Sequence, residues 1–280
     1  TGSVTGTSYT GGLVGEAENS SITNSYATGR VTGTGIRTGG LVGYANGSTI
    51  TNSYATGSVR GEGSTGGLVG QAIDSTILNS YATGSVTGTE ISTGGLAGGA
   101  GDSTTITNSY STGSVKGKDR TGGLVGSVGE LTTISSSYAT GRVTGTGDYT
   151  GGLVGRAYSS STITNSYATG SVTGGSMTGG LVGRAYGSSD NFVTISNSYA
   201  TGSVSGSSST GGLVGSVYGS TITNSYWNKE TTGRNNSAGG GSGKTTKEMM
   251  KQITYSDWDF NEIWKIQEGV SYPTLRNIAN

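Results

Sequence analysis

The sequence predicts an all-β fold, namely a β-solenoid (parallel β-helix) of about eight coils of ~28 residues, with a small C-terminal cap that contains a short helix. Three observations predict it. The hexapeptide TGGLVG, once as TGGLAG, occurs eight times; a block of the type ITNSYATGSV follows each copy; and the last residues differ in composition. We therefore divide the chain into a repeat array, residues 1–226, and a C-terminal capping segment, residues 227–280.

The two blocks recur at near-constant spacing. The leucines of the hexapeptides stand at residues 13, 41, 68, 96, 124, 153, 181 and 213, which are 27 to 32 residues apart. In the second block a Tyr follows the Ile by four residues, and in all copies but the last a Val follows that Tyr by five. The links between the blocks vary in length, which is typical of surface turns between fixed structural walls.

The repeats indicate strands rather than helices, because Gly and β-branched residues dominate and no apolar stripe has a helical period. Three short strands per repeat are expected, around Ile-Asn-Tyr, around Val and around Leu-Val. None is long enough to be stable alone, so each must pair with its counterpart in the next coil. Strands about 4.8 Å apart give a rod roughly 40 Å long, of either hand.

Columns of equivalent residues then run along the rod, and the Ile, Val and Leu columns are expected to fill its lumen. Ile50, Asn52 and Tyr54 share one face if the strand is regular, and Thr51 and Ser53 share the other. An inward Asn column would form a structural ladder of amide hydrogen bonds. Its members are Asn24, Asn52, Asn79, Asn108, Asn165, Asn197 and Asn224. The repeated glycines are expected to supply positive φ at corners and a close approach of backbones.

Composition and charge exclude several classes of function. The chain has no Cys and no His, so thiolate metal sites, disulfides and the usual general base are missing. The formal net charge is zero and no basic block occurs, which argues against nucleic-acid binding. No apolar run approaches 18 residues, so no membrane insertion is expected. We predict no catalytic residue, no metal and no cofactor.

The capping segment contains all three Trp and the only Pro. KTTKEMMKQI (244–253) predicts a short helix with Thr245 as N-cap and Glu248 completing a capping box, and AGGGSGK (238–244) before it reads as a flexible connector. An apolar cluster follows, made of Trp258, Phe260, Ile263, Trp264 and Ile266 and then Tyr272, Pro273 and Leu275. Because a final coil exposes its lumen and its strand edges, we expect the segment to cover both.

The TGGLVG and ITNSYATGSVTG blocks resemble the GLUG-motif repeats of large secreted bacterial proteins. These include filamentous-haemagglutinin-like adhesins and regions that flank some IgA-cleaving metallopeptidases. The tail, with SYWNKETTG at 225–233 and IWKIQEGVSYPTLR at 263–276, is similar to the usual ending of such arrays. The resemblance covers essentially the whole chain and implies an extracellular β-solenoid module on a bacterial cell surface. A peptidase activity is not implied, because HExxH cannot occur without His.

Residues that vary between copies are the candidates for a ligand or partner surface. We select aromatic residues near the turns and in the insertion at Ser188–Val193, where side chains can stack on sugars or on partner chains. They are Tyr44, Tyr158, Tyr186, Tyr218 and Phe192. A second candidate is an outward hydroxyl grid like that of ice-binding solenoids, formed by Thr23, Thr51, Thr107, Thr164 and Thr223 and interrupted by Leu78, Ser135 and Ser196.

Two catalytic interpretations are weaker. TGGLVG lacks the following helix and the Gly-Lys-Ser/Thr of a phosphate loop, so a corner plus a strand explains it better. Asp74 and Asp102 occupy related turns and could form a carboxylate pair, but no acidic column persists beyond them.

The sequence therefore predicts a non-enzymatic structural or adhesive module, extracellular or on a bacterial cell surface. The expected partners are other copies of itself or the rest of a longer parent chain, since the array begins in mid-repeat with TGSVTG, and host or biofilm glycans. Carbohydrate binding and ice binding are the alternative functions.

Overall fold

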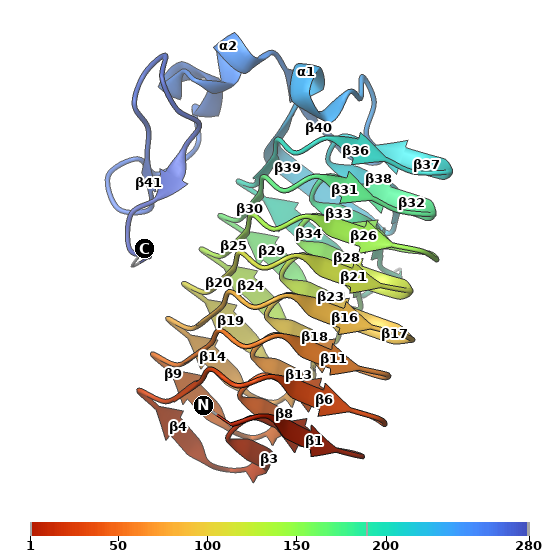
Figure 1. Cartoon of the computed structure of the whole chain (residues 1–280). Helices are drawn as coiled ribbons and strands as arrows, with labels where there is room; N and C mark the ends of the chain where they lie inside the picture. Colours follow the sequence, from red (N-terminus) through yellow and green to blue (C-terminus); the bar gives the residue numbers. More distant parts are fainter. Residues whose placement is uncertain (1, 189, 279–280) are drawn as a thin grey trace.

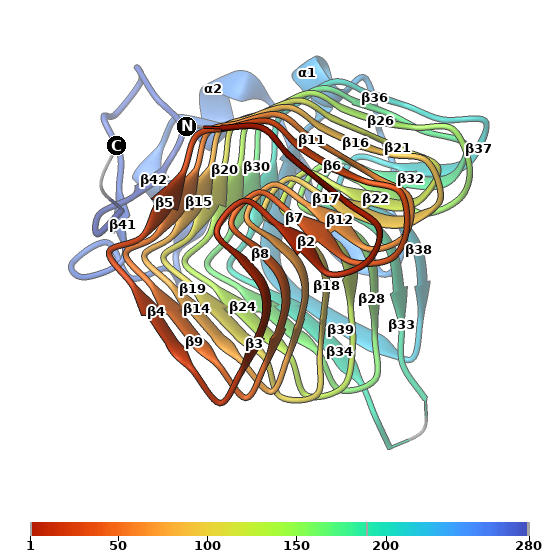
Figure 2. The same ribbon diagram turned by 60° about the horizontal axis from the view of Figure 1, so that its bottom comes forward.

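The computed structural model describes residues 2–188 and 190–278 and confirms the β-solenoid of eight coils. Each coil runs through the same succession of short strands, and each strand pairs in parallel with its counterpart in the next coil. Figure 1 shows the coils stacked from the N-terminal end upward, and Figure 2 shows them nearly superimposed. We number the coils 1 to 8 by the Leu of each hexapeptide, from Leu13 to Leu213.

Two sheets are built from strands of two to four residues. The Val sheet consists of β1 (Val4–Gly6), β6 (Val31–Gly33), β11 (Val59–Gly61), β16 (Val86–Gly88), β21 (Val115–Gly117), β26 (Val143–Gly145), β31 (Val172–Thr173) and β36 (Val204–Ser205). The Thr sheet consists of β2 (Thr10–Gly11), β7 (Thr38–Gly39), β12 (Thr65–Gly66), β17 (Ile91–Gly94), β22 (Asp119–Gly122), β27 (Thr150–Gly151), β32 (Ser176–Gly179) and β37 (Ser208–Gly211).

The variable sheet follows each hexapeptide Leu and carries the residues that differ most between coils. It consists of β3 (Val14–Glu18), β8 (Val42–Asn46), β13 (Val69–Ile73), β18 (Ala97–Gly101), β23 (Val125–Val128), β28 (Val154–Tyr158), β33 (Val182–Tyr186) and β38 (Val214–Tyr218).

The second block forms two successive strands in each coil. The Ile strands are β4 (Ser21–Thr23), β9 (Thr49–Thr51), β14 (Thr76–Leu78), β19 (Thr105–Thr107), β24 (Thr133–Ser135), β29 (Thr162–Thr164) and β34 (Val193–Ser196). The Tyr strands are β5 (Tyr26–Ala27), β10 (Tyr54–Ala55), β15 (Tyr81–Ala82), β20 (Tyr110–Ser111), β25 (Tyr138–Ala139), β30 (Tyr167–Ala168) and β35 (Tyr199–Ala200). In coil 8 both are replaced by the single strand β39 (Ser220–Asn228), which joins the two rows into one sheet and crosses the predicted domain boundary.

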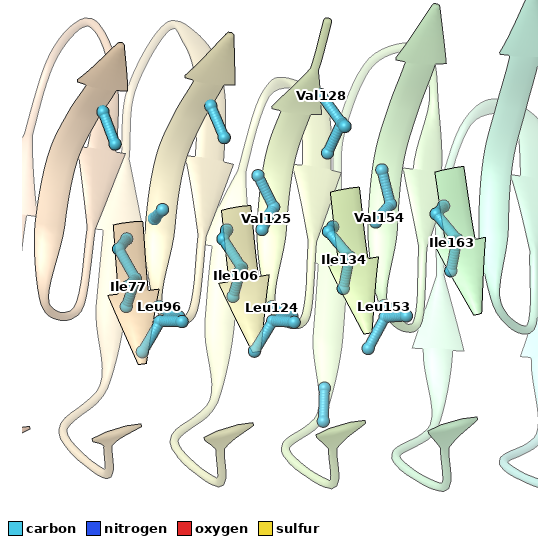
Figure 3. Close-up of a cluster of buried hydrophobic side chains, with 14 of the residues drawn as sticks. Ile77, Leu96, Ile106, Leu124, Val125, Val128, Ile134, Leu153, Val154 and Ile163 are labelled. Atoms are coloured by element: carbon cyan, nitrogen blue, oxygen red, sulfur yellow. The ribbon is translucent and has the colours of Figure 1, made fainter. Parts of the chain in front are cut away.

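The register pairs equivalent residues, so columns do run along the rod. Val59 pairs with Val86, for example, and Ile77 with Ile106. From coil 2 onward the Ile and Leu columns fill the lumen with fully buried side chains, apart from the partly buried Ile222 of coil 8, together with inward Ala and Val of the variable sheet (Figure 3). The Val column is buried in all coils from Val31 on, and Val31, Val59 and Val86 form a cluster of their own. At the first coil Leu13 remains 55% exposed.

The glycines of the hexapeptide serve close approach rather than positive φ. A Cβ on Gly40 would collide with the carbonyl oxygen of Gly67 in the next coil, and one on Gly43 with the backbone of Tyr9 and Gly15. None of the hexapeptide glycines has a positive φ among the described residues. The expectation that they provide left-handed corners is therefore wrong.

Asparagine takes the left-handed corner instead. All seven column asparagines have φ between 46° and 50°, and Ser136 takes the same conformation in coil 5. Asn tolerates this conformation better than other residues with a Cβ. The corner interrupts the two-residue alternation, so that Ile50 points inward, Ser53 also points inward, and Tyr54 points outward. The predicted shared face of Ile50, Asn52 and Tyr54 is wrong for this reason.

The inward serine after each Asn forms a hydroxyl ladder. Its hydroxyl donates to the carbonyl oxygen two residues earlier and accepts the backbone N–H of the equivalent Ser in the preceding coil. Ser109 Oγ, for example, lies 2.8 Å from Thr107 O and 3.2 Å from Ser80 N. The ladder contains Ser53, Ser80, Ser109, Ser137, Ser166, Ser198 and Ser225, all buried.

Replacing Ser109 by Ala is expected to destabilise the solenoid by about 1–3 kcal/mol, because the buried N–H of Ser80 loses its acceptor. Ser114→Ala is the matched control, since Ser114 is exposed in a link between strands. The measurement is the midpoint of chemical unfolding followed by circular dichroism. Equal midpoints for the two variants would show that the ladder is energetically neutral.

The C-terminal segment first closes the end of the solenoid. Trp227 enters the core beside Gly212, and its Nε1 donates to Arg234 O at 2.9 Å. A short helix, α1 (Lys229–Thr232), follows its N-cap Asn228, and β40 (Gly240–Lys244) then pairs with β39. The predicted flexible connector at 238–244 is therefore largely a strand. Gly239, Gly240 and Gly241 have positive φ, which explains the glycine run.

The remainder of the segment folds back along the side of the rod (Figure 1). It contains α2 (Thr246–Met249), the 3₁₀-helix η1 (Gln252–Tyr255) and the antiparallel pair β41 (Trp264–Lys265) and β42 (Thr274–Leu275). Thr245 and Glu248 form the predicted capping box. The predicted apolar cluster packs on the Tyr column of coils 4 to 8 rather than on the lumen.

Candidate functional site

The repeated Tyr column forms a stack on the outside of the rod. From Tyr26 to Tyr199 successive ring centroids are 4.9 to 5.2 Å apart, and the ring planes differ by at most 8°. Tyr26 is 58% exposed, whereas Tyr199 is 1% exposed and donates its hydroxyl to Pro273 O at 2.6 Å. Burial raises the pKa of the Tyr138 phenol to about 12 and that of Tyr199 well above its ordinary value. Because the ring faces lie against one another, this stack offers only edges and hydroxyl groups to a ligand.

The variable sheet presents a chemically different outer face. The third residue of each strand forms one outward column, made of Glu16, Tyr44, Gln71, Gly99, Ser127, Arg156, Arg184 and Ser216. The fifth residue forms a second outward column, made of Glu18, Asn46, Ile73, Gly101, Tyr158, Tyr186 and Tyr218. Tyr44 therefore lies in a different column from the other three predicted Tyr residues.

A corner column borders this face. It contains the residue that precedes the Thr of each hexapeptide: Tyr9, Arg37, Ser64, Ser92, Arg120, Tyr149, Met177 and Ser209. All of these except Ser64 have a positive φ. The arginines of this column and of the sheet were not singled out from the sequence.

In coils 1 to 3 the corner column and the third-residue column form a small aromatic cluster. The Arg37 guanidinium lies 4.0 Å from the ring centroid of Tyr44 and 5.0 Å from that of Tyr9. Tyr9 and Tyr44 stack with centroids 5.6 Å apart, and Arg37 Nε donates to Gln71 Oε1 at 2.6 Å. Ring stacking and the cation–π contact thus hold Tyr44 against Tyr9 and Arg37.

In coils 6 to 8 the corner column and both outward columns form a larger cluster of arginine and tyrosine. Arg156 lies 5.0 Å from the ring of Tyr158, and Arg184 lies 4.7 Å from that of Tyr186 and donates to Tyr149 Oη at 3.2 Å. Tyr186 stacks on Tyr218 with centroids 5.4 Å apart. Tyr186 and Tyr218 remain 37% and 63% exposed.

The groups that shift the pKa of Arg156 in this cluster include no carboxylate. Burial, Arg120 and Arg184 lower the pKa of Arg156, and only the neighbouring Tyr149 and Tyr158 oppose them. Arg156 also pairs with Arg184 in register, and like charges directly opposite each other weaken a sheet. The Nε atoms of both arginines are buried without a hydrogen-bond partner among the described residues.

The other predicted residues are placed as follows. The seven column asparagines are exposed or half-buried corners, and one pair, Asn79 Nδ2 to Asn52 Oδ1 at 3.2 Å, has an amide-to-amide hydrogen bond among the described residues. A buried amide ladder is therefore wrong, because the left-handed corner turns these side chains outward. Phe192 is 52% exposed in the connection between β33 and β34.

The hydroxyl grid does lie on the outer side of the Ile strands. Thr23 and Thr223 are exposed, and Thr51, Thr107 and Thr164 are half-buried. Two of its hydroxyls are already bonded along the column, Thr107 to Ser135 at 2.9 Å and Thr164 to Ser196 at 3.0 Å. Ser53, expected on this face, is part of the buried ladder instead.

The two candidate catalytic carboxylates occupy corners. Asp74 and Asp102 are exposed and have φ of 46° and 48°. Within residues 2–188 and 190–278, no group of three or more acidic side chains could hold a metal ion. No helix in the described part of the chain is both long enough and apolar enough to cross a membrane.

Comparison with known proteins identifies the repeat. The GLUG motif matches residues 6–32, 34–60, 61–87, 89–116 and 146–173. No curated protein matches the chain in sequence. A similar solved structure is the crystal structure of a protein from Bacteroides ovatus proposed to be an immunoglobulin A1 protease, with a TM-score of 0.56 and 19% identity over 91% of this chain and 87% of that one. At this identity the likeness concerns the fold alone.

Proposed function

Because five segments of its solenoid match the GLUG motif, we propose that this chain is a non-enzymatic structural module of an extracellular bacterial surface protein or fibre. In this proposal the solenoid is a rigid rod, and its outer faces present side chains for attachment to surfaces or for self-assembly.

The observation that carries the proposal is the separation of constant and variable residues. The columns that face the lumen repeat Leu, Ile and Ala in most coils, and from coil 2 onward their side chains are buried apart from the partly buried Val217 and Ile222 of coil 8. Ser111, Val128, Val217 and Trp227 take the place of Ala. The columns that face outward change from Glu to Tyr, Gly, Ser or Arg between adjacent coils. A constant core under a changing surface is what a presenting scaffold requires.

The non-enzymatic part of the proposal is supported by the same packing. Among the described residues, the lumen is packed with buried Leu, Ile, Val and Ala side chains. The pair Asp74 and Asp102, which sequence alone made the best catalytic candidate, lies at exposed corners where a carboxylate is solvated.

An attachment assay tests the proposal. Beads coated with the folded chain are expected to be retained on bacterial polysaccharide, or on a layer of the chain itself, more strongly than beads coated with the heat-unfolded chain. The purified chain is expected to leave immunoglobulin A1 uncleaved. Equal retention of the two kinds of bead would contradict presentation by the fold, and cleavage of the antibody would contradict a non-enzymatic module.

A second candidate function is carbohydrate binding, favoured by the arginine and tyrosine cluster of coils 6 to 8. Its exposed, stacked Tyr186 and Tyr218 beside Arg184 combine aromatic and cationic groups on one face.

A further inference from the structure

The outer face of the variable sheet contains a groove at coils 4 and 5. In these coils the outward columns carry only small residues, Gly99 and Gly101 in β18 and Ser127 in β23. Larger side chains stand on either side, Gln71 and Ile73 in coil 3 and the arginine and tyrosine cluster from coil 6. The resulting groove has a volume of about 320 Å³. That volume lies within the range of small-molecule sites.

Two serines in the wall of this groove have hydroxyl groups that are not bonded to the protein. Ser92 is 5% exposed and Ser127 is 8% exposed, and both lie in its wall. Neither hydroxyl has a hydrogen bond among the residues that the structure describes, and neither belongs to the fully buried atoms that lack a partner, so both oxygens can be reached from the groove. This contrasts with the serine ladder inside the rod, in which the hydroxyls are bonded on both sides. The groove therefore has unused hydrogen-bonding capacity for a polar ligand.

The wall on the coil 6 side adds an aromatic ring and a positive charge. Tyr158 and Arg120 both line the groove. Arg156, directly behind Tyr158, is close enough to Arg120 for the two charges to repel each other. The wall itself contains one basic residue, Arg120, and one acidic residue, Asp102, and Arg156 adds a further positive charge behind Tyr158.

From these contacts we infer that the groove binds a sugar unit that carries an anionic group, a carboxylate or a sulfate. Arg120 would bind the anionic group, Tyr158 would pack against the apolar face of the sugar ring, and Ser92 and Ser127 would bond to its hydroxyls. A nucleic acid fits less well, because the basic region spans few coils and the chain has zero net charge. The inference rests on the proposed presenting role and names a ligand class for one face.

Equivalent positions in other coils show which residues the fold accepts, and the test substitutions are taken from them. Arg120→Ser removes the charge and places at this corner the residue that Ser92 and Ser209 already provide with positive φ. Gly99→Gln fills the groove with the residue that stands directly opposite in coil 3, and a Cβ at Gly99 meets only ordinary contacts. Arg60→Thr is the control, because it removes an equal charge from the Val sheet, where Thr32 and Thr87 flank it.

Binding of three soluble probes tests the inference: oligogalacturonate as the carboxylated probe, dextran sulfate as the sulfated one and dextran as the neutral one. The parent chain is expected to bind at least one anionic probe and to bind dextran at least roughly tenfold more weakly. Arg120→Ser and Gly99→Gln are each expected to weaken that binding by roughly tenfold or more, and Arg60→Thr to leave it within about twofold. Thermal melts followed by circular dichroism verify that each variant is folded.

Several results would overturn the inference. The first is that the parent chain binds neither anionic probe, or that it binds dextran as strongly as the anionic probes. The second is that folded Gly99→Gln binds the anionic probe as strongly as the parent chain does. The third is that Arg60→Thr loses as much binding as Arg120→Ser, which would indicate diffuse electrostatic attraction. Preference for one anionic probe decides between carboxylate and sulfate. If the folded beads are still retained in the attachment assay while all three probes fail, the presenting role stands and this ligand class does not.

Discussion

Alanine at Gly123 is expected to destabilise the solenoid by more than about 3 kcal/mol, whereas alanine at Gly99 is expected to be neutral or slightly stabilising. A Cβ on Gly123 would collide with the carbonyl oxygen of Gly152 in the next coil and would lie 2.9 Å from Ala139 Cβ. Both obstacles belong to the packed coils, so the collision cannot be relieved without breaking hydrogen bonds between coils. At Gly99 the nearest atoms are side-chain atoms of Gln71 and Ser64, 3.7 and 3.8 Å away.

The two glycine variants should be compared by denaturant unfolding followed by circular dichroism. Midpoints are the quantity to compare, because a repeat array need not unfold in two states. The pair is well matched, since both residues are buried and neither has a positive φ. A midpoint for Gly123→Ala at or above that of Gly99→Ala would contradict the close approach that we assign to TGGLVG.

Replacing Trp264 by Ala is expected to weaken docking of the C-terminal segment on the Tyr column by about 3–5 kcal/mol. Trp264 is fully buried, with its ring centroid 4.4 Å from that of Trp258 and 6.1 Å from those of Tyr167 and Tyr199. Its removal takes away the largest fully buried side chain of the segment. The tyrosines beneath would then become exposed to water.

Alkaline titration followed by phenolate absorbance measures this exposure. In the folded chain burial raises the pKa of Tyr138 to about 12 from 10.0, so this burial favours folding fully below pH 10, and its contribution is lost as the pH rises toward 12. In Trp264→Ala the buried tyrosines are expected to titrate closer to pH 10. Ile253→Ala, at a position 81% exposed in the same segment, should retain the parent curve. Identical curves for the parent and Trp264→Ala would contradict the docking role.

The solenoid could be predicted from sequence because its signals repeat. Eight leucines at near-constant spacing identify the lumen, and Thr245 with Glu248 identifies the short helix. The direction of the side chains after Ile could not be predicted by strict alternation. A left-handed Asn lies between Ile50 and Tyr54, and it turns the serine inward and the tyrosine outward.

The candidate site was only partly predictable for a different reason. Tyr158 and Tyr186 were chosen as aromatic residues that break the repeat, but Arg156 and Arg184 break it equally, two residues earlier. In the motif VGxAx, Val and Ala point inward, so both variable positions point outward, and this signal could have found the arginines. The contacts of these arginines with the corner column depend on how neighbouring coils pack, and the order of residues along the chain does not indicate this packing.

The docked C-terminal segment also determines how the molecule would respond to a mechanical pull. The segment runs back from the closed end of the solenoid and lies along coils 4 to 8, so a tension applied at its far end acts beside the middle of the rod. Such a load would first separate Trp258, Trp264 and Leu275 from the tyrosine rings, one contact after another, before it reached β39 and the coils. The segment would therefore detach and extend under load while the coils of the solenoid stayed folded.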